Sequence, residues 1–282
     1  MALLEVEGVD VRFGGIHALR QADLAVERGT VTGLIGPNGA GKTTMFNVIC
    51  GLQPLHRGRV VLDGRDLGNL RPHRRARLGI ARTFQRLEIF GSLTVRENIL
   101  AAAEVRRRWA RDRSNPRAVT DAVLALVGLA PLAARRADTL PTGQARLVEL
   151  GRALATRPAL LLLDEPSSGL DEHESDELGD LLVRLAMAGM GILLVEHDMD
   201  LVMRVCSCIS VLDFGAVLAT GSPEQIRADD RVRAAYLGTE GAPEDGPVDG
   251  PVDRGDPPGT DAGTADGDTL RPGRAETADV LA

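Results

Sequence analysis

One glycine-rich segment, set between an apolar run and a helix-forming run, limits what this chain can fold into more than any other feature. The segment and the residue after it are Gly36, Pro37, Asn38, Gly39, Ala40, Gly41, Lys42, Thr43 and Thr44. It matches a pattern in which backbone N–H groups converge on phosphate oxygens. That pattern requires a strand before it and a helix after it, and residues 31–35 and 43–51 predict these elements. The sequence therefore predicts an α/β fold with a phosphate-binding loop.

Lys42 is the only lysine among the 33 basic residues of the chain. A chain so biased toward arginine should keep a lysine only where arginine cannot replace it. A compact ammonium on a slim side chain suits a crowded phosphate site and reaches the outer phosphates. The hydroxyl of Thr43 is suited to bind Mg²⁺ beside them. These two side chains predict a triphosphate site that works with Mg²⁺.

Three later apolar runs predict further strands of a parallel sheet. They lie at residues 159–163, 191–195 and 209–212, and a helix-forming stretch at 174–188 separates the first two. Strands that alternate with helices form parallel sheets, which bind ligands at the carboxyl ends of their strands. We therefore expect the functional site at that edge of the sheet, beside the phosphate loop.

Two other regions are expected to attach to this sheet. Apolar and polar residues alternate in short pieces at 3–35, which predicts antiparallel strands. Residues from about 92 to 156 predict an inserted helical subdomain, which opens with a capping box between Thr94 and Glu97. The expected fold over residues 1–240 is an α/β P-loop NTPase with an N-terminal antiparallel β subdomain and a helical insertion.

The acidic charge is concentrated at the end of the sequence. Residues 241–282 hold ten acidic residues and three arginines, which accounts for the whole formal charge of -7. Their Gly, Pro, Asp and Thr content predicts a disordered acidic tail. Residues 1–240 are therefore neutral overall, which argues against a nucleic-acid partner. Their arginine-rich stretches, 71–82 and 106–113, are expected to form solvated helix faces, with an anionic membrane surface as one surface that they could face. We expect no membrane span and no targeting segment, and hence a cytosolic chain.

The apolar run at residues 160–163 is followed by two carboxylates, Asp164 and Glu165. Strands often end in acidic turn residues, so the pair alone is weak evidence for a site. In a parallel sheet, however, this strand end lies close to the phosphate loop. Asp164 is suited to support Mg²⁺, and Glu165 is suited to orient and polarise water for attack on the γ-phosphate of a nucleotide.

Residues 1 to about 238 resemble the ABC ATPase family, because further segments follow in that family's order. Thr83-Phe84-Gln85 resembles the glutamine loop, 168–171 the D-loop that ends in Asp171, and 195–198 the strand end that carries the switch histidine, His197. Each of these residues has an ordinary structural interpretation when taken singly, and their joint order favours the family. The resemblance implies that Gln85 senses Mg²⁺ and water and faces a membrane partner. It also implies that His197 contacts the γ-phosphate and that Phe13 stacks on adenine.

The signature segment of that family has a variant form here. Its commonest form is Leu-Ser-Gly-Gly-Gln, and this chain has Leu140-Pro141-Thr142-Gly143-Gln144. The serine hydroxyl that touches the nucleotide of the other subunit is replaced by Pro141. The resemblance implies that Thr142 supplies a substitute hydroxyl, and that Gly143 and the helix starting at Gln144 hold the phosphate through backbone N–H groups.

Several segments resemble the branched-chain amino-acid uptake branch of the family. They lie at residues 12–15, 81–85, 93–98, 140–144, 195–199, 221–226 and 235–238. Membership implies an ATP-hydrolysing subunit at the cytoplasmic face of the cell membrane, with ATP and Mg²⁺ as ligands. The implied partners are permease subunits, a second ATPase cassette and, indirectly, an extracytoplasmic solute-binding protein.

Other functions stay open at this stage. Urea importers and lipopolysaccharide-export ATPases share many of these sequence motifs, so the transported solute is implied by the resemblance only. A soluble ABC ATPase acting on ribosomes or DNA usually has two cassettes or a long coiled-coil insertion, and this chain shows neither. A P-loop kinase or GTPase would not explain the signature segment, the D-loop and the histidine together.

Overall fold

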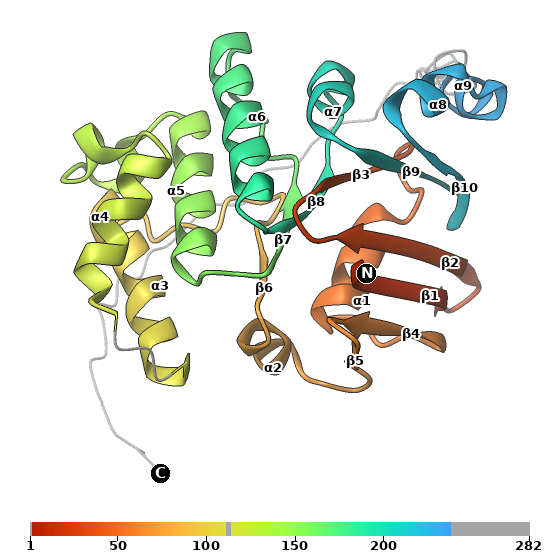
Figure 1. Ribbon diagram of the computed structural model, residues 1–282, viewed down its shortest axis with the longest axis horizontal. Helices are drawn as coiled ribbons and strands as arrows, with labels where there is room; N and C mark the ends of the chain where they lie inside the picture. The colour runs from red at the N-terminus through yellow and green to blue at the C-terminus, as the bar shows by residue number, and fades with distance from the viewer. Residues whose placement is uncertain (1, 111–113, 238–282) are drawn as a thin grey trace, which may run out of the picture. The chain divides into compact units, whose positions relative to one another are not determined.

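The computed structural model describes residues 2–110 and 114–237, which form two β-sheets and the helices around them (Figure 1). The expected acidic tail at 241–282 lies outside these residues. The mixed α/β architecture confirms the expected fold class. The boundaries expected at residues 92, 156 and 240 stay predictions.

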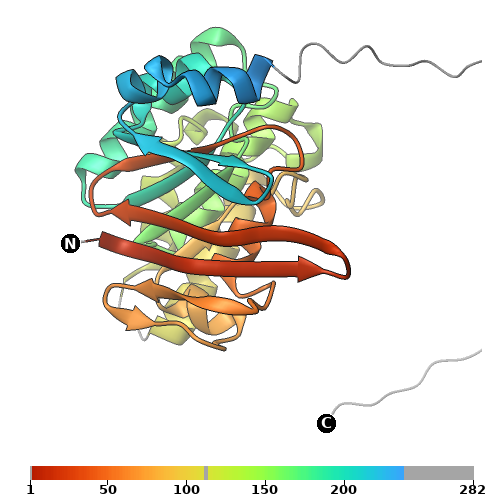
Figure 2. The same ribbon diagram turned by 90° about the vertical axis from the view of Figure 1, so that its right-hand side faces the viewer.

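The first sheet is antiparallel, with strand order β2-β1-β4-β5. Its strands are β1 (Ala2–Phe13), β2 (Ile16–Glu27), β4 (Arg57–Leu62) and β5 (Arg65–Asp66). Figure 2 shows the β1–β2 hairpin across the front of the molecule, with β4 and β5 below it. The short apolar pieces of the sequence are joined into long strands, because register shifts in β1 let the chain bend without leaving the sheet.

The second sheet has the order β10-β9-β3-β8-β7-β6, and all neighbours are parallel except β10 and β9. Its strands are β3 (Val31–Ile35), β6 (Ile80–Arg82), β7 (Leu160–Asp164), β8 (Gly191–Val195), β9 (Cys208–Asp213) and β10 (Ala216–Gly221). Strands β3, β7 and β8 are buried at every residue, as expected for strands covered on both faces. Their carboxyl ends meet at one edge, with β8 between β3 and β7.

Helices surround the second sheet and form a group of their own beside it. They are α1 (Lys42–Cys50), α2 (Pro72–Arg77), α3 (Val95–Ala110), α4 (Pro116–Leu126), α5 (Thr142–Ala155), α6 (Glu172–Met187), α7 (Met199–Val205), α8 (Pro223–Ala228) and α9 (Asp230–Leu237). Helices α3, α4 and α5 pack on one another, within the stretch where the sequence predicts an insertion (Figure 1). The capping box is formed, because the Thr94 N–H donates to Glu97 Oε2 (2.8 Å) and the Glu97 N–H donates to Thr94 Oγ1 (3.2 Å).

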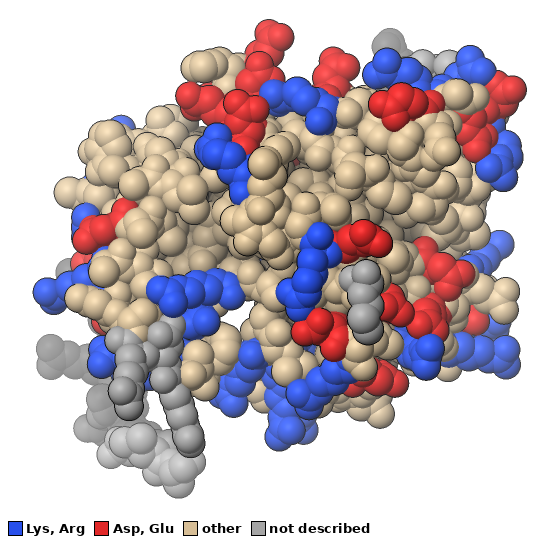
Figure 3. All heavy atoms as spheres, viewed as in Figure 1, with Lys and Arg blue, Asp and Glu red and all other residues tan. Residues whose placement is uncertain are grey.

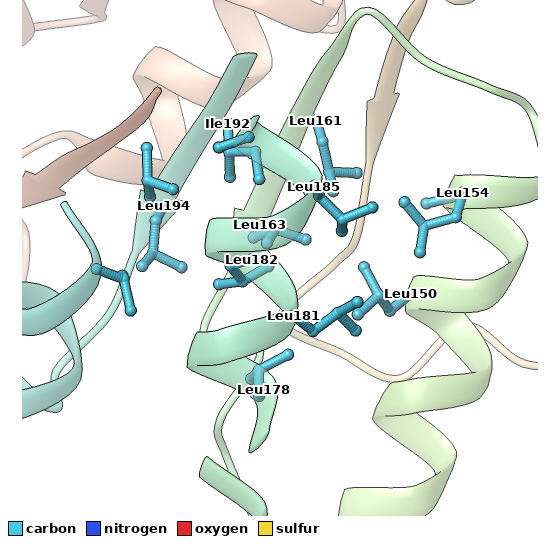
Figure 4. Packing of buried hydrophobic residues seen from close by; sticks show 14 of the residues in the cluster. Leu150, Leu154, Leu161, Leu163, Leu178, Leu181, Leu182, Leu185, Ile192 and Leu194 are labelled. Carbon is cyan, nitrogen blue, oxygen red and sulfur yellow. The ribbon is translucent and has the colours of Figure 1, made fainter. Parts of the chain in front are cut away.

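A leucine-rich core joins this helical group to the parallel sheet. Figure 4 shows Leu161 and Leu163 of β7 facing leucines of α6, with Leu150 and Leu154 of α5 on the other side. All of these side chains are buried. The packing therefore fixes the strand that ends in Asp164 against the helix that follows the signature segment.

The expectation of a solvated arginine face at residues 71–82 is wrong for two arginines, Arg75 and Arg82, which are buried. The Arg75 guanidinium donates to the carbonyl oxygens of Val48 (2.8 Å) and Ile49 (3.0 Å) at the end of α1. The Val48 carbonyl also accepts the N–H of Gly51 (3.0 Å), so the buried guanidinium adds a second donor at the C-terminus of the helix, where carbonyl oxygens lack intrahelical partners. Elsewhere, on the face seen in Figure 3, acidic and basic side chains occur side by side.

Candidate functional site

The glycine-rich loop runs from β3 to α1, and its shape requires glycine at two positions. A Cβ at Gly36 (φ 152°) would lie 2.0 Å from the carbonyl oxygen of Leu212, and one at Gly41 (φ 110°) would lie 2.6 Å from that of Ala18. The loop is thus packed against β9 and β2 through its backbone. Its remaining N–H groups and the N-terminus of α1 give it the positive potential that attracts phosphate.

Lys42, the first residue of α1, is buried and folds back over the loop. Its ammonium donates to the carbonyl oxygens of Gly36 (2.5 Å) and Pro37 (3.0 Å). Burial lowers the pKa of Lys42, while the nearby carboxylates of Glu165 and Asp164 act in the opposite direction. The lone lysine is therefore held by the loop and faces the two predicted carboxylates.

A cavity of about 490 Å³ opens at this edge of the parallel sheet. The predicted site residues that line it are Asn38, Gly39, Ala40, Gly41, Lys42, Thr43, Thr44, Gln85, Asp164, Glu165 and His197. They come from four segments that lie far apart in the sequence. They lie close together because the carboxyl ends of the parallel strands meet at one edge of the sheet, as expected from the sequence.

Glu165 lies at the centre of the predicted catalytic groups. Its Oε1 is 2.9 Å from Nε2 of His197 and accepts a hydrogen bond from Nε2 of Gln85 at 3.4 Å. Its backbone is left-handed (φ 50°), and its N–H donates to the carbonyl oxygen of Val195 on β8 (2.9 Å). A non-glycine residue in this conformation is strained, and such strain concentrates at functional sites. The fold thus holds one carboxylate beside a histidine and an amide at the mouth of the cavity.

Asp164 is bound by an arginine that the sequence reasoning did not assign to the site. Arg82 Nη2 donates to Asp164 Oδ2 at 3.0 Å, and the two side chains are only 6% and 4% exposed. Arg82 Nη1 also donates to Asn47 Oδ1 (2.6 Å), and its guanidinium stacks between the rings of Phe46 and Phe84. A charge buried in this way requires a partner, and Arg82 supplies one for Asp164.

The segment that carries Gln85 is bound to α5 by charged side chains. Arg146 donates to the carbonyl oxygens of Phe84 (2.8 Å) and Gln85 (2.7 Å). Glu149 accepts the N–H of Phe84 at 3.1 Å through Oε1, while its Oε2 has no hydrogen-bond partner. Burial raises the pKa of Glu149, against the opposing effect of these contacts. The helix that follows the signature segment therefore fixes the backbone beside Gln85.

Seven predicted site residues do not line the cavity: Phe13, Gly36, Pro37, Thr142, Gly143, Gln144 and Asp171. Phe13 lies at the end of β1, half exposed. A Cβ at Gly143 would lie 2.5 Å from the Leu170 side chain, so the signature and D-loop segments pack on each other. Asp171 caps α6 by accepting the N–H of Glu174 at 2.8 Å. Their predicted contacts with nucleotide stay predictions.

Eight lining residues were not predicted as site residues: Gly15, Ile16, His17, Ala18, Arg20, Val195, Phe214 and Gly215. His17 Nε2 lies 2.8 Å from Asp10 Oδ1, and this hydrogen bond lowers the pKa of Asp10. Phe214 lies in the turn between β9 and β10. The sequence carries only a weak signal for that turn, Gly215, because the residue before it is not one of those that favour a two-residue hairpin.

A second cavity, of about 550 Å³, is lined in part by the segment around Gln85, through Phe84, Glu88 and Phe90. Its lining includes Leu52, Phe84, Phe90 and Val105, all of which are exposed apolar side chains. They come from the region after α1, the segment around Gln85 and helix α3. We call these four residues the apolar groove. A surface of this kind is typical of a protein interface.

Comparisons of the sequence give two family matches and several relatives. A family described as ABC transporter matches residues 19–168, and one described as Branched-chain amino acid ATP-binding cassette transporter matches residues 216–242. The chain is 42% identical over 249 residues to the high-affinity branched-chain amino acid transport ATP-binding protein BraF of Pseudomonas aeruginosa, covering 84% of this chain and 98% of that protein. It is 33% identical over 240 residues to the lipopolysaccharide export system ATP-binding protein LptB of Haemophilus influenzae, covering 85% and 99%.

The fold is similar to solved ATP-binding cassettes. One of them, the ADP conformation of an ATP-binding cassette of an ABC transporter, matches with a TM-score of 0.73 at 30% identity. The match covers 84% of this chain and 99% of that one. Among residues 2–110 and 114–237, no helix is long and apolar enough to cross a membrane.

Proposed function

This chain belongs to the ABC transporter family, and we propose that it is the ATP-hydrolysing subunit of an importer for branched-chain amino acids. The observation that carries the proposal is the meeting of Glu165, His197 and Gln85 within 3.4 Å in the cavity that Lys42 and the glycine-rich loop line. The choice of solute follows the 42% identity to BraF and the match at residues 216–242. The relative from lipopolysaccharide export is less similar, at 33%.

Hydrolysis follows from what each side chain presents to the nucleotide. The loop N–H groups and Lys42 bind the phosphates and neutralise charge that develops on the γ-phosphoryl group. Glu165 accepts a hydrogen bond from water and aligns its oxygen with the γ-phosphorus. The water oxygen forms a bond to this phosphorus while the bond to the bridging oxygen breaks, and the water passes a proton to Glu165, which releases it to solvent. ADP and phosphate result. His197 and Gln85 hold the Glu165 carboxylate in place, and His197 also contacts the γ-phosphate.

The donor set at this site suits Mg²⁺. The Thr43 hydroxyl, the Asp164 carboxylate and the Gln85 amide supply oxygen atoms, which this ion prefers. Few protein ligands are needed, because Mg²⁺ keeps several waters and binds the nucleotide phosphates. Bound Mg²⁺ would neutralise phosphate charge. Arg82 occupies one oxygen of Asp164 and leaves the other for this role.

A second cassette completes the site. Thr142, Gly143 and Gln144 lie outside the cavity of their own chain, at the start of α5. They contact the nucleotide of a partner cassette in a head-to-tail dimer, so one chain alone hydrolyses ATP poorly. Helix α5 also fixes the backbone beside Gln85 through Arg146 and Glu149. Movement of α5 when the dimer closes therefore shifts the position of Gln85 at the catalytic site.

Permease subunits occupy the apolar groove. Its four exposed apolar side chains border the Gln85 segment, and Phe84 belongs to both. A helix of the permease that covers the groove therefore contacts the segment that senses the nucleotide. The chain lies at the cytoplasmic face of the membrane, and an extracytoplasmic binding protein delivers the solute to the permease.

Affinity purification of the tagged chain from detergent-solubilised native membranes tests this function. We expect multi-span permeases and a second cassette to co-purify. After reconstitution, ATP hydrolysis is expected to rise with binding protein loaded with leucine, isoleucine or valine. Stimulation by urea or by lipopolysaccharide instead would support the ATPase activity but refute branched-chain amino acids as the transported solute. Recovery of only ribosomal or DNA-bound partners would overturn the transport function.

A further inference from the structure

Glu196 is a buried carboxylate to which the proposed hydrolysis assigns no role. It directly follows strand β8, next to His197, and it is only 4% exposed. In the described part of the chain, its polar partners are hydrogen-bond donors and no arginine or lysine pairs with it. A carboxylate is costly to bury unless other groups compensate its charge. Such a group is retained where its contacts are needed.

The two oxygens of Glu196 bind the backbone on either side of the Glu165–His197 pair. Oε1 accepts the N–H of Ser167 at 2.8 Å, and Oε2 accepts the N–H of His197 at 3.2 Å. Ser167 lies two residues after Glu165, whose Oε1 is 2.9 Å from Nε2 of His197. The carboxylate therefore joins the backbone of one catalytic group to the backbone of the other.

The backbone at Glu165 needs an anchor of this kind, because it is left-handed (φ 50°) and strained. Strained conformations persist where the surrounding structure fixes them from several sides. Before the turn, the N–H of Glu165 donates to the carbonyl oxygen of Val195 (2.9 Å), at the end of the neighbouring strand β8 (Figure 1). After it, Glu196 binds Ser167. The end of β8 thus holds the strained residue from both sides.

Only a carboxylate suits both of these contacts. Two N–H donors meet its two oxygens, and hydrogen bonds to a carboxylate are stronger than those to a neutral acceptor. A glutamine has one acceptor oxygen and one NH₂ group, so its NH₂ would face the N–H of Ser167 or of His197. Burial raises the pKa of Glu196, and the hydrogen bonds from Ser167, His197 and Asp198 act in the opposite direction.

We propose that Glu196 is a positioning residue for ATP hydrolysis, because its carboxylate fixes the backbones of Ser167 and His197 and so keeps His197 in contact with Glu165. The inference rests on the proposed ATPase activity and adds the residue that holds its catalytic pair. Glu196 is buried behind the cavity and does not line it. It therefore acts through Glu165 and leaves the binding of ATP to Lys42 and the glycine-rich loop.

Glu196→Gln in the purified transporter tests the proposal through turnover. We expect kcat to fall about 10- to 100-fold, because a misplaced catalytic group loses its alignment with the γ-phosphorus. KM for ATP should not change. Added to Glu165→Gln, the same substitution should lower kcat by less than about 2-fold further, since groups that act as one unit are not additive. Asp23→Asn is the matched control, because Asp23 also accepts a backbone N–H, that of Gly8 (2.7 Å), outside the cavity. Its turnover should equal that of the wild type.

Hydrogen exchange of the full chain tests the anchor without any activity measurement. In the wild type, the N–H of Ser167 should exchange slowly although it lies in a turn. Glu196→Gln should speed exchange at Ser167 and His197, and Asp23→Asn should not. Rapid exchange at Ser167 in the wild type would overturn the anchor even if the variant did not fold.

The contrary turnover results are distinct from one another. Wild-type kcat in Glu196→Gln would overturn the positioning role, as would a raised KM with unchanged kcat. A full further loss in the Glu165→Gln background would show that Glu196 acts independently of Glu165, which also overturns the proposal. Absence of ATP turnover in the wild-type transporter would instead refute the proposed function itself.

Discussion

Replacing Arg82 by methionine removes the buried partner of Asp164 and should destabilise the folded chain. Breaking a buried ion pair from one side costs about 3–5 kcal/mol, because the remaining charge is left without a partner. Asp164 borders the nucleotide cavity, where water can reach its free oxygen, so we expect the lower end, about 3 kcal/mol. For a domain of this size that is a fall in melting temperature of about 6–12 °C.

A double-mutant cycle with Asp164→Asn isolates the ion pair. We expect the Arg82→Met/Asp164→Asn chain to lose less stability than the sum of the single variants, by about 1–3 kcal/mol in urea unfolding. Arg152→Met is the matched control, since Arg152 stacks on Phe90 in the same region without contacting Asp164. Its effect should add to that of Asp164→Asn. Additive effects of Arg82→Met and Asp164→Asn would refute the coupling.

Two further predictions concern the segment that carries Gln85. Burial raises the pKa of Glu149, so the folded chain binds more protons than the unfolded chain above the ordinary value of about 4.3, and its stability falls as pH rises through the raised pKa. Glu149→Gln should therefore raise the melting temperature more at pH 8 than at pH 5, and an equal change at both would contradict this. In the apolar groove, Val105→Asp should abolish permease co-purification and keep ATP binding, whereas Met187→Asp, at an 81% exposed site on α6, should change neither. Retention of the permease by Val105→Asp would exclude the groove as its docking site.

The nucleotide cavity could be predicted largely from the sequence because its signals are local. The glycine-rich loop needs its own glycines and one lysine, and Asp164 and Glu165 follow directly on an apolar run. Parallel strand order then brings their ends together, although β8 lies between β3 and β7. Gln85 and His197 were found through their order along the chain, and both reach Glu165.

What the sequence did not predict depends on contacts between distant segments. Arg82 belongs to an arginine-rich stretch that appeared solvated, and only the pairing of β6 with β7 places it against Asp164. Phe214 looks like an ordinary apolar residue until the register of β9 and β10 shows that it occupies a two-residue turn. The nucleotide contacts proposed for Thr142, Gly143 and Gln144 would require a second cassette, which one sequence does not describe.

The most direct test of the central claim is ATP turnover by the purified transporter with Glu165→Gln in place of the wild-type chain. The account predicts a loss of about 10²- to 10⁴-fold, because the carboxylate that accepts a hydrogen bond from water is gone. The dissociation constant for ATP should stay unchanged, since Lys42 and the loop remain. Turnover near that of the wild type would contradict the role of Glu165. Loss of ATP binding in the same variant would contradict the assignment of binding to Lys42 and the loop and of hydrolysis to Glu165.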